Sequence, residues 1–336
     1  MTKVPGGPQT HVPDRSDGQV YVMPEALDLA TQVALAAGRP LLLRGKPGSG
    51  KSSMAPYVAQ QKNWRFYNFV VTSQTRARDL QWTFDGVRRL ADAQTRSWWG
   101  NRPGRQLVPD LYVEPGPLWW AFAPRSAAQH VRNAYQQTQS VVADGWKHPE
   151  QKRNEERDPE HAVVLIDEID KADPDVPNGL LGPLATNGFT VAESGTRVEF
   201  EASADGFQER PFYQNLVVIT TNEERELPQA FLRRCVIAKL VPPTEVEELV
   251  RIAREHLEAR VGKASDRDIE LATALATELK SVRDAAREQG VREPSTAEYL
   301  DALWACKSLG IGVKKDDALW QAVRGLTLVK PQQFGE

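Results

Sequence analysis

The stretch "LLLRGKPGSGKSS" (residues 41–53) constrains the fold of this chain more than any other. Three leucines predict a short buried strand, and the segment "KSSMAPYVAQQ" that follows the glycines predicts a helix. Between them stands Gly45-x-x-x-x-Gly50-Lys51-Ser52, in which glycines allow backbone N–H groups to turn inward around an anion. This strand–loop–helix arrangement is typical of α/β proteins that bind nucleoside triphosphates.

The residue types in this loop predict which part of a nucleotide each would contact. Lys51 would neutralise the β- and γ-phosphates, and the hydroxyl of Ser52 would coordinate Mg²⁺. The N-terminus of the following helix adds its positive end to the same site. The predicted nucleotide-binding residues are Gly45, Lys46, Pro47, Gly48, Ser49, Gly50, Lys51, Ser52 and Ser53.

A pair of acids stands at the end of a second strongly apolar segment, "VVLIDEID" (163–170). Four apolar residues deliver Asp167 and Glu168 to the carboxyl edge of the sheet, where ligands bind in open α/β folds. Asp167 can hold Mg²⁺ through water, and Glu168 can polarise an attacking water, which a pure binding module would not need. For Asp170 we expect helix capping.

Polar residues also follow the apolar strand "NLVVITTN" (215–222). Asn222 could hold the attacking water or the γ-phosphate by hydrogen bonding, and turn chemistry is the alternative for an Asn that starts a loop. Arg233 and Arg234 end a short helix, where cations also complement the helix dipole. Their functional interpretation is an arginine finger, supplied across a subunit boundary to neutralise charge on the γ-phosphate.

Apolar segments alternate with helical or loop segments, which predicts a parallel α/β sheet. The segment 189–202 has period two on both sides of a Ser-Gly pair and predicts a β-hairpin. Ahead of the first strand, one helical face would carry Ala26, Leu29, Val33 and Ala36, and Gly38 would end that helix. The expected strands are residues 39–45, 65–72, 162–168 and 215–222.

Composition divides the rest of the chain into regions. Residues 1–18 predict a flexible tail, and residues 19–242 an α/β nucleotide-binding domain. Within it, about 122–161 predicts a polar surface insertion, with a partner-docking loop as the alternative. Strands cease after that domain, and 243–336 predicts a helical domain. Two of its helices are expected to start at capping boxes, formed by Thr244 with Glu247 and by Ser295 with Glu298. Two others are expected over residues 266–289 and 316–328.

Charge and hydropathy argue against several classes of protein, although they leave room for a local basic groove. A net charge of −3 and a pI near 6.1 give no overall basic field for nucleic acid or an anionic membrane. We find no apolar run long enough to span a membrane and no apolar signal-peptide core. Cys235 and Cys306 lack metal-type spacing, and we expect two reduced thiols in a cytoplasmic protein.

The order of these parts resembles that of the AAA+ ATPases, and more closely their MoxR-like branch. The stretches "GRPLLLRGKPGSGKS", "EPGPLWWAF" ahead of "LIDEIDKAD", "ITTNEERELPQAFLRRC" and "REPSTAEYLDAL" carry this resemblance. It implies a five-stranded parallel sheet followed by a small all-helical lid, with ATP and Mg²⁺ as ligands. It also implies that Asn222 is the sensor residue and that Arg234 occupies the finger position, with Arg233 beside it. Arg292 is the candidate lid arginine.

The resemblance further implies a ring, usually a hexamer, with the nucleotide between neighbouring subunits. Members commonly remodel proteins, often with a von Willebrand factor A-type partner, and others accompany bacterial conflict systems. In this branch a hairpin projects toward the pore from the region between the second and third strands. Trp98 and Trp99 are candidates for an exposed contact there, and Trp119 and Trp120 for packing.

Three functions use these residues. The first is a Mg²⁺-dependent ATPase that couples turnover to remodelling of a protein partner. The second is a slowly hydrolysing regulatory switch that controls an effector. The third, a nucleic-acid-stimulated motor, is disfavoured by the acidic net charge. A small-molecule kinase would not need the Arg pair or the lid. The loop does not distinguish ATP from GTP, although the chain has no NKxD-type base reader.

Overall fold

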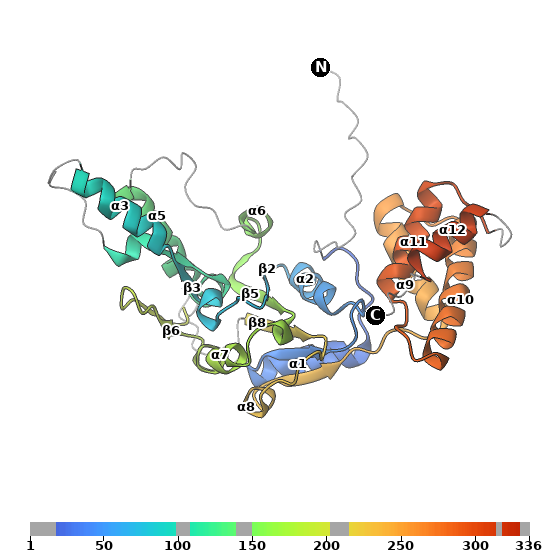
Figure 1. Ribbon diagram of the computed structural model, residues 1–336, viewed down its shortest axis with the longest axis horizontal. Helices are drawn as coiled ribbons and strands as arrows, with labels where there is room; N and C mark the ends of the chain where they lie inside the picture. Colours follow the sequence, from blue (N-terminus) through green and yellow to red (C-terminus); the bar gives the residue numbers. More distant parts are fainter. Residues whose placement is uncertain (1–17, 99–107, 139–149, 202–214, 314–317, 330–336) are drawn as a thin grey trace, which may run out of the picture. The chain divides into compact units, whose positions relative to one another are not determined.

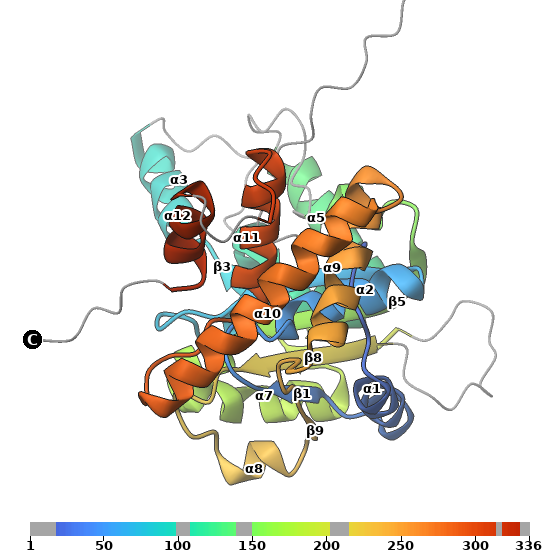
Figure 2. The same cartoon turned by 90° about the vertical axis from the view of Figure 1, so that its right-hand side faces the viewer.

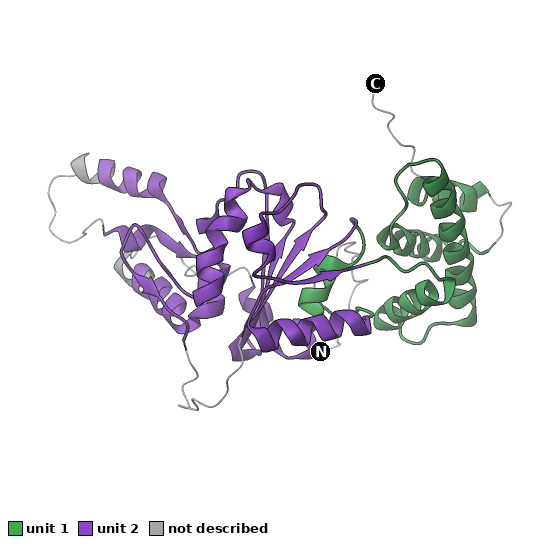
Figure 3. Ribbon diagram, turned by 90° about the horizontal axis from the view of Figure 1, so that it is seen from below, with its two compact units in different colours: residues 1–22, 47–57, 241–336 green, residues 23–46, 58–240 purple. Residues whose placement is uncertain are grey.

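The computed structural model describes residues 18–98, 108–138, 150–201, 215–313 and 318–329 (Figure 1). Contacts between residues divide the chain into two units, coloured separately in Figure 3. The sheet unit comprises residues 23–46 and 58–240. The helical unit comprises residues 1–22, 47–57 and 241–336. No helix among the described residues is both long and apolar enough to cross a membrane.

A five-stranded parallel sheet forms the centre of the sheet unit and confirms the predicted fold class. Its strand order is β2-β5-β8-β1-β9. Leu41, Leu42 and Leu43 are fully buried, because the strand that carries them lies between two others. The strands are β1 (Leu41–Arg44), β2 (Trp64–Val70), β5 (Asp158–Asp167), β8 (Asn215–Thr221) and β9 (Val236–Lys239).

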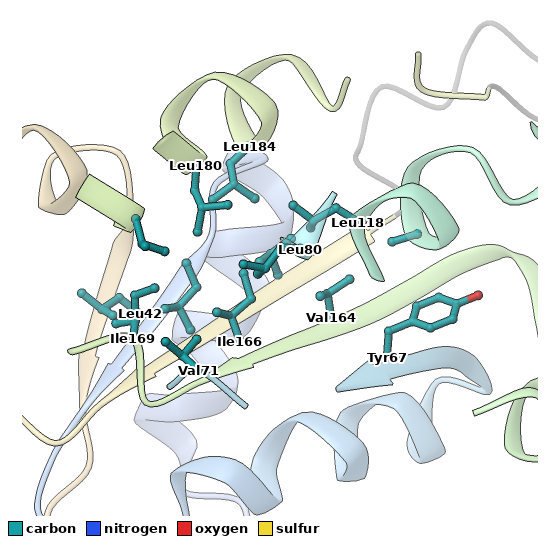
Figure 4. Close-up of a cluster of buried hydrophobic side chains, with 14 of the residues drawn as sticks. Leu42, Tyr67, Val71, Leu80, Leu118, Val164, Ile166, Ile169, Leu180 and Leu184 are labelled. Atoms are coloured by element: carbon teal, nitrogen blue, oxygen red, sulfur yellow. The ribbon is translucent and has the colours of Figure 1, made fainter. Parts of the chain in front are cut away.

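Helices that pack on the sheet complete its main apolar core. Leu118 belongs to α4 (Pro117–Phe122), and Leu180 and Leu184 belong to α7 (Asp175–Thr186). Figure 4 shows these leucines in one cluster with Val164 and Ile166 of strand β5. The burial of apolar strand side chains on this scale is what stabilises a parallel sheet covered by helices.

The first helix, α1 (Glu25–Ala37), ends at Gly38, whose φ of 60° is left-handed as a glycine cap allows. The predicted apolar face is wrong: Leu29 is 62% exposed and Val33 is 45% exposed. The buried residues of α1 are Leu27, Thr31 and Ala34. Thr31 can be buried because its hydroxyl donates to the carbonyl oxygen of Leu27 at 2.8 Å.

Two inserted segments share a second, smaller core in the sheet unit. Strand β3 (Trp82–Phe84) pairs antiparallel with β4 (Val113–Pro115), and α3 (Gly86–Trp98) connects them together with η2 (Pro109–Tyr112). The predicted hairpin is confirmed as β6 (Phe189–Thr190) and β7 (Arg197–Val198). The shared core contains Trp82, Val113, Trp119, Ala123, Ala127, Val191 and Val198.

A hydrogen bond and ring contacts join the two inserted segments. Glu193, in the turn between β6 and β7, accepts a bond from the indole N–H of Trp82 at 2.6 Å. Phe189 stacks on Trp82 and meets Trp119 edge-on, with ring centroids 5.6 and 6.1 Å apart. Trp119 is fully buried, so its predicted packing role is confirmed. The side chains of Trp98 and Trp99 lie outside the described residues.

The prediction of a polar surface insertion over 122–161 is partly wrong. Most of its first half forms α5 (Pro124–Thr138), whose Ala127 is fully buried in the second core. Near the other end, α6 (Gln151–Asn154) precedes β5, which begins at Asp158 rather than at residue 162. The side chain of Asn154 exchanges hydrogen bonds with the backbone of Phe66 in β2. Residues 139–149 lie outside the described chain.

The described residues of the lid, 243–313 and 318–329, form four helices around their own apolar core, and α9 and α10 lie side by side (Figure 2). The predicted capping box at Ser295 and Glu298 is confirmed. The predicted capping box at Thr244 and Glu247 is wrong, because the helix begins at Val246 and its N-cap is Glu245. The helices are α9 (Val246–Val261), α10 (Asp266–Glu288), α11 (Thr296–Ser308) and α12 (Ala318–Thr327).

A buried arginine holds the start of the lid. Arg283 of α10 is 5% exposed, and its guanidinium donates to the carbonyl oxygens of Pro243 at 2.6 Å and of Pro294 at 2.8 Å. Burial lowers the pKa of Arg283. These bonds fix both ends of the helical segment that precedes α11, since Pro243 lies before α9 and Pro294 directly before Ser295.

Candidate active site

Three neighbouring strands end at one edge of the sheet, and each is followed by residues of the predicted site. Strand β1 leads into Gly45 and Lys46, β5 ends at Asp167 and is followed by Glu168, and β8 is followed by Asn222. Because the strands are parallel and ordered β5-β8-β1, their carboxyl ends lie next to one another. The sheet therefore brings together side chains that are far apart in the sequence, as predicted for a ligand edge.

The loop after β1 has the backbone that an anion nest requires. Gly48 and Gly50 have φ of 73° and 85°, which L side chains rarely adopt. A β-carbon at Gly48 would lie 2.4 Å from the β-carbon of Ser295, so only glycine fits there. Helix α2 (Lys51–Gln61) starts directly after this loop.

Two polar side chains of the loop point to an anionic ligand. Lys51, the first residue of α2, is only 5% exposed, and a cation at this position suits the phosphates of a nucleotide. The hydroxyl of Ser49 is buried and makes no hydrogen bond within the described chain. An orphaned hydroxyl and a buried cation at a helix N-terminus fit the phosphates of a nucleotide.

Glu168 stands in a left-handed backbone conformation, with φ of 60°. Its carboxylate has a different partner on each oxygen. The side-chain amide of Asn222 donates to Oε1 at 3.2 Å, and the ammonium of Lys171 donates to Oε2 at 2.5 Å. This hydrogen bond raises the pKa of Lys171. The structure thus joins the two predicted residues Glu168 and Asn222 directly.

Thr220 of β8 ties the last residue of β5 and the residue that follows it to the neighbouring strand. Its hydroxyl donates to Oδ1 of Asp167 at 2.5 Å and accepts the backbone N–H of Glu168 at 2.9 Å. The Thr220 residue is fully buried. We did not predict this role, and its signal in the sequence is a hydroxyl residue directly after the aliphatic run 216–219 of β8.

Asp170 has a different role from the one we predicted. It does not cap a helix: it lies in the short turn η3 (Ile169–Lys171), and its Oδ2 accepts the backbone N–H groups of Asn222 at 3.1 Å and Glu224 at 3.0 Å. Asp170 is 2% exposed, and its other oxygen has no hydrogen-bond partner within the described chain. Its carboxylate therefore fixes the backbone that carries Asn222.

The residues available for a metal ion are few. The described chain holds no group of three or more His, Cys, Asp or Glu side chains arranged around a common point. From the sequence, Mg²⁺ is expected to take the Ser52 hydroxyl, Asp167 and oxygens of the nucleotide, which suits an ion that keeps several waters and few protein ligands. These are the predicted metal residues.

Arg233 and Arg234 lie at the opposite end of the sheet. They follow α8 (Gln229–Leu232) and precede β9, whose first residue pairs with Leu41 at the start of β1. Nε of Arg233 donates to the carbonyl oxygen of Gln229 at 3.3 Å. Arg234 is exposed, and its guanidinium makes no ion pair or hydrogen bond with any described residue. The two predicted finger candidates therefore differ in their contacts: the guanidinium of Arg233 bonds to its own helix, and that of Arg234 bonds to no described residue.

The lid candidate Arg292 is held within the helical unit. Its guanidinium pairs with both carboxylate oxygens of Glu298, at 3.1 and 3.2 Å. Glu298 also accepts the backbone N–H of Ser295, the cap of α11 and the residue that faces Gly48. Arg292 is thus anchored to the helix start that borders the glycine loop.

Comparisons with known proteins agree with this site. The family model described as "ATPase family associated with various cellular activities (AAA)" matches residues 41–243. Two crystal structures of NtrX from Brucella abortus, one of them in complex with ADP, are 11% identical to the chain. Their TM-scores are 0.46 for the ADP complex and 0.47 for the other structure.

The chain aligns over 95% of its own length with these structures and spans 58% of theirs. No curated protein matches the sequence. The family match runs from the first strand of the sheet to the start of the lid, and so includes the glycine loop, Asp167, Glu168 and Asn222. The chain belongs to the AAA family of ATPases.

Proposed function

We propose that this chain is a Mg²⁺-dependent ATPase that forms a ring, with six subunits as the expected number, and couples hydrolysis to remodelling a protein partner. The observation that carries the proposal is the Glu168 carboxylate held by Asn222 at the ligand edge of the sheet. A carboxylate with a fixed orientation at this edge suits a base that activates water. A module that only binds nucleotide would not need one.

The residues would divide the reaction among them. Backbone N–H groups of the glycine loop and the ammonium of Lys51 would bind the β- and γ-phosphates of ATP. Bound at Ser52 and Asp167, Mg²⁺ would supply charge neutralisation. Glu168 would accept a proton from the water that attacks the γ-phosphorus, and Asn222 would keep the carboxylate oriented.

The position of Arg234 supports action on a neighbouring subunit. Strand β9 separates it from the edge that carries Asp167 and Glu168, and four residues of extended strand span about 13 Å. An arginine at that end has no short route to the site of its own chain. Of the two candidates, Arg234 is the one whose guanidinium makes no hydrogen bond or ion pair with a residue that the structure describes, and we propose that it is the finger that stabilises charge on the γ-phosphate.

A test by subunit mixing follows from this division. Glu168→Gln should bind ATP without hydrolysing it, and Arg234→Ala should also be inactive. Mixed rings should regain part of the activity, because an intact Glu168 from one variant then meets an intact Arg234 from the other. Arg233→Ala is the matched control and should retain most of the wild-type rate. Wild-type activity of Glu168→Gln alone or of Arg234→Ala alone would refute the catalytic roles proposed for these residues.

We propose a protein rather than a nucleic acid as the partner. The net charge of −3 gives no general attraction for phosphates, and α3 carries exposed apolar side chains. Val87 is 81% exposed and Leu90 is 60% exposed, and their spacing places them on one helix face. Exposed apolar residues of this kind suit contact with a protein chain. ATPase activity that rises with single-stranded nucleic acid would contradict this choice.

A further inference from the structure

Lys171 is a charged residue beside the candidate base that the nucleotide-binding motifs do not explain. It stands at the end of η3, three residues after Glu168, and its backbone N–H donates to the carbonyl oxygen of Glu168 at 3.0 Å. Its ammonium reaches back over the same turn to Oε2 of Glu168. The turn therefore carries both the acid and a cation directed at it.

The contacts of Glu168 come from two directions. Asn222, on the loop after β8, holds Oε1, and Lys171, on the turn after β5, holds Oε2. A carboxylate on a single hydrogen bond can still rotate about that bond, whereas two donors on different oxygens fix the plane of the group. Each oxygen keeps a second lone pair, so a water can still be accepted.

Packing alone does not immobilise this side chain. The Glu168 side chain is 29% exposed and that of Lys171 is 43% exposed. A glutamate has three rotatable bonds, and ordering it costs conformational entropy unless contacts define one rotamer. The hydrogen bond to Glu168 raises the pKa of Lys171, and the nearby charges of Glu168, Glu224 and Asp170 raise it further, so the ammonium keeps its charge beside the carboxylate.

We propose that Lys171 is a positioning residue for the reaction, which holds the Glu168 carboxylate in the orientation needed to accept a proton from water. It does so as one of two donors, with Asn222 as the other. This proposal rests on the proposed ATPase function. It assigns Lys171 a role in the catalytic step and none in nucleotide affinity.

The test compares neutral and charged replacements of Lys171. Lys171→Met keeps the length of the stem and removes the charge, Lys171→Gln is a second neutral variant, and Lys171→Arg keeps a cationic donor. In the neutral variants kcat should fall about tenfold, a part of the 10²–10⁴ that a well-placed base contributes. KM for ATP and the Kd of a fluorescent ATP analogue should change less than about twofold, because substrate binding is unaffected.

Rescue and an unrelated lysine provide the controls. Lys171→Arg should keep at least about half of the wild-type kcat, because its guanidinium can also donate to Oε2. Lys152→Met removes an exposed lysine of α6, which lies away from the ligand edge, and should match wild type. A neutral variant with unchanged kcat, or an arginine variant as slow as the neutral ones, would overturn the proposal.

A double-mutant cycle separates this role from others. In single-turnover measurements, Glu168→Gln/Lys171→Met should show the same residual rate as Glu168→Gln, because Lys171 acts only through that carboxylate. An additional tenfold loss in the double variant would mean that Lys171 acts elsewhere and would also overturn the proposal. Failure of the proposed function itself looks different: Glu168→Gln would then hydrolyse ATP as fast as wild type.

Discussion

Asp170 offers the sharpest test of how the ligand edge is built. Its Oδ2 accepts two backbone N–H groups, those of Asn222 and Glu224, in a buried position. Asp170→Ala removes the acceptor and leaves both N–H groups without a partner. The substitution does not touch the side chains of Glu168 or Asn222, so any effect on them passes through the backbone.

The magnitude follows from the two lost hydrogen bonds. A buried donor left unsatisfied costs about 1–3 kcal/mol, so the loss of both acceptor contacts in Asp170→Ala should lower the free energy of unfolding by about 2–6 kcal/mol. For a domain of this size that corresponds to a Tm lower by roughly 5–15 °C. Asp170→Asn should lose about half as much, since one amide oxygen can accept both N–H groups without the negative charge.

The assay is thermal unfolding of each variant, followed by ATPase activity well below its Tm. Asp173→Ala is the matched control: this exposed acid accepts one N–H, from Asp175 at 3.0 Å, and its loss should cost less than about 1 kcal/mol. We expect Asp170→Ala to lower kcat as well, because Asn222 is no longer held. A Tm within about 1 °C of wild type would refute the role derived for Asp170.

Three further predictions concern other parts of the chain. Arg283→Met should lower the free energy of unfolding of the lid by about 2–4 kcal/mol in urea denaturation, because two backbone carbonyls lose a charged donor. Gly48→Ala should abolish ATP-analogue binding in a fluorescence titration, since its β-carbon would clash with Ser295; unchanged affinity would contradict the loop geometry. Burial raises the pKa of Cys235 to about 12, so in a Cys306→Ser background its alkylation should accelerate about tenfold per pH unit between pH 8 and 10, whereas a plateau below pH 10 would contradict the shift.

The parts of the fold that could be predicted depend on local patterns. A leucine strand, a glycine loop and a helix follow one another within 21 residues of sequence, from Leu41 to Gln61, and the order of residues alone specifies them. The meeting of Glu168 and Asn222 was also predictable, because parallel strands deliver the residues that follow them to one edge. The structure adds that β5 and β8 pair directly, which brings the side chains of Glu168 and Asn222 into hydrogen-bond contact at 3.2 Å.

The parts that could not be predicted depend on tertiary partners. Helix α1 has two candidate faces, and Thr31 lies on the buried one only because its hydroxyl bonds within the helix. The contacts of Asp170 and Lys171 require the left-handed turn at Glu168, which the letters "DEIDK" do not reveal. At Thr244 the capping pattern was present, but its hydroxyl bonds to Glu245 and the helix starts later.

The bond between Trp82 and Glu193 joins segments that are 111 residues apart in the sequence. The small core around it includes Trp119 and Val191 and meets the core of the central sheet only through partly buried side chains such as Trp120 and Phe189. Such a cluster can open as one cooperative unit while the larger core stays closed. Amide hydrogens of β3, β4, β6 and β7 would then exchange with solvent at a common rate, faster than those of β1 and β8. The two insertions would thus form a single foldon of lower stability, attached to a more rigid nucleotide-binding sheet.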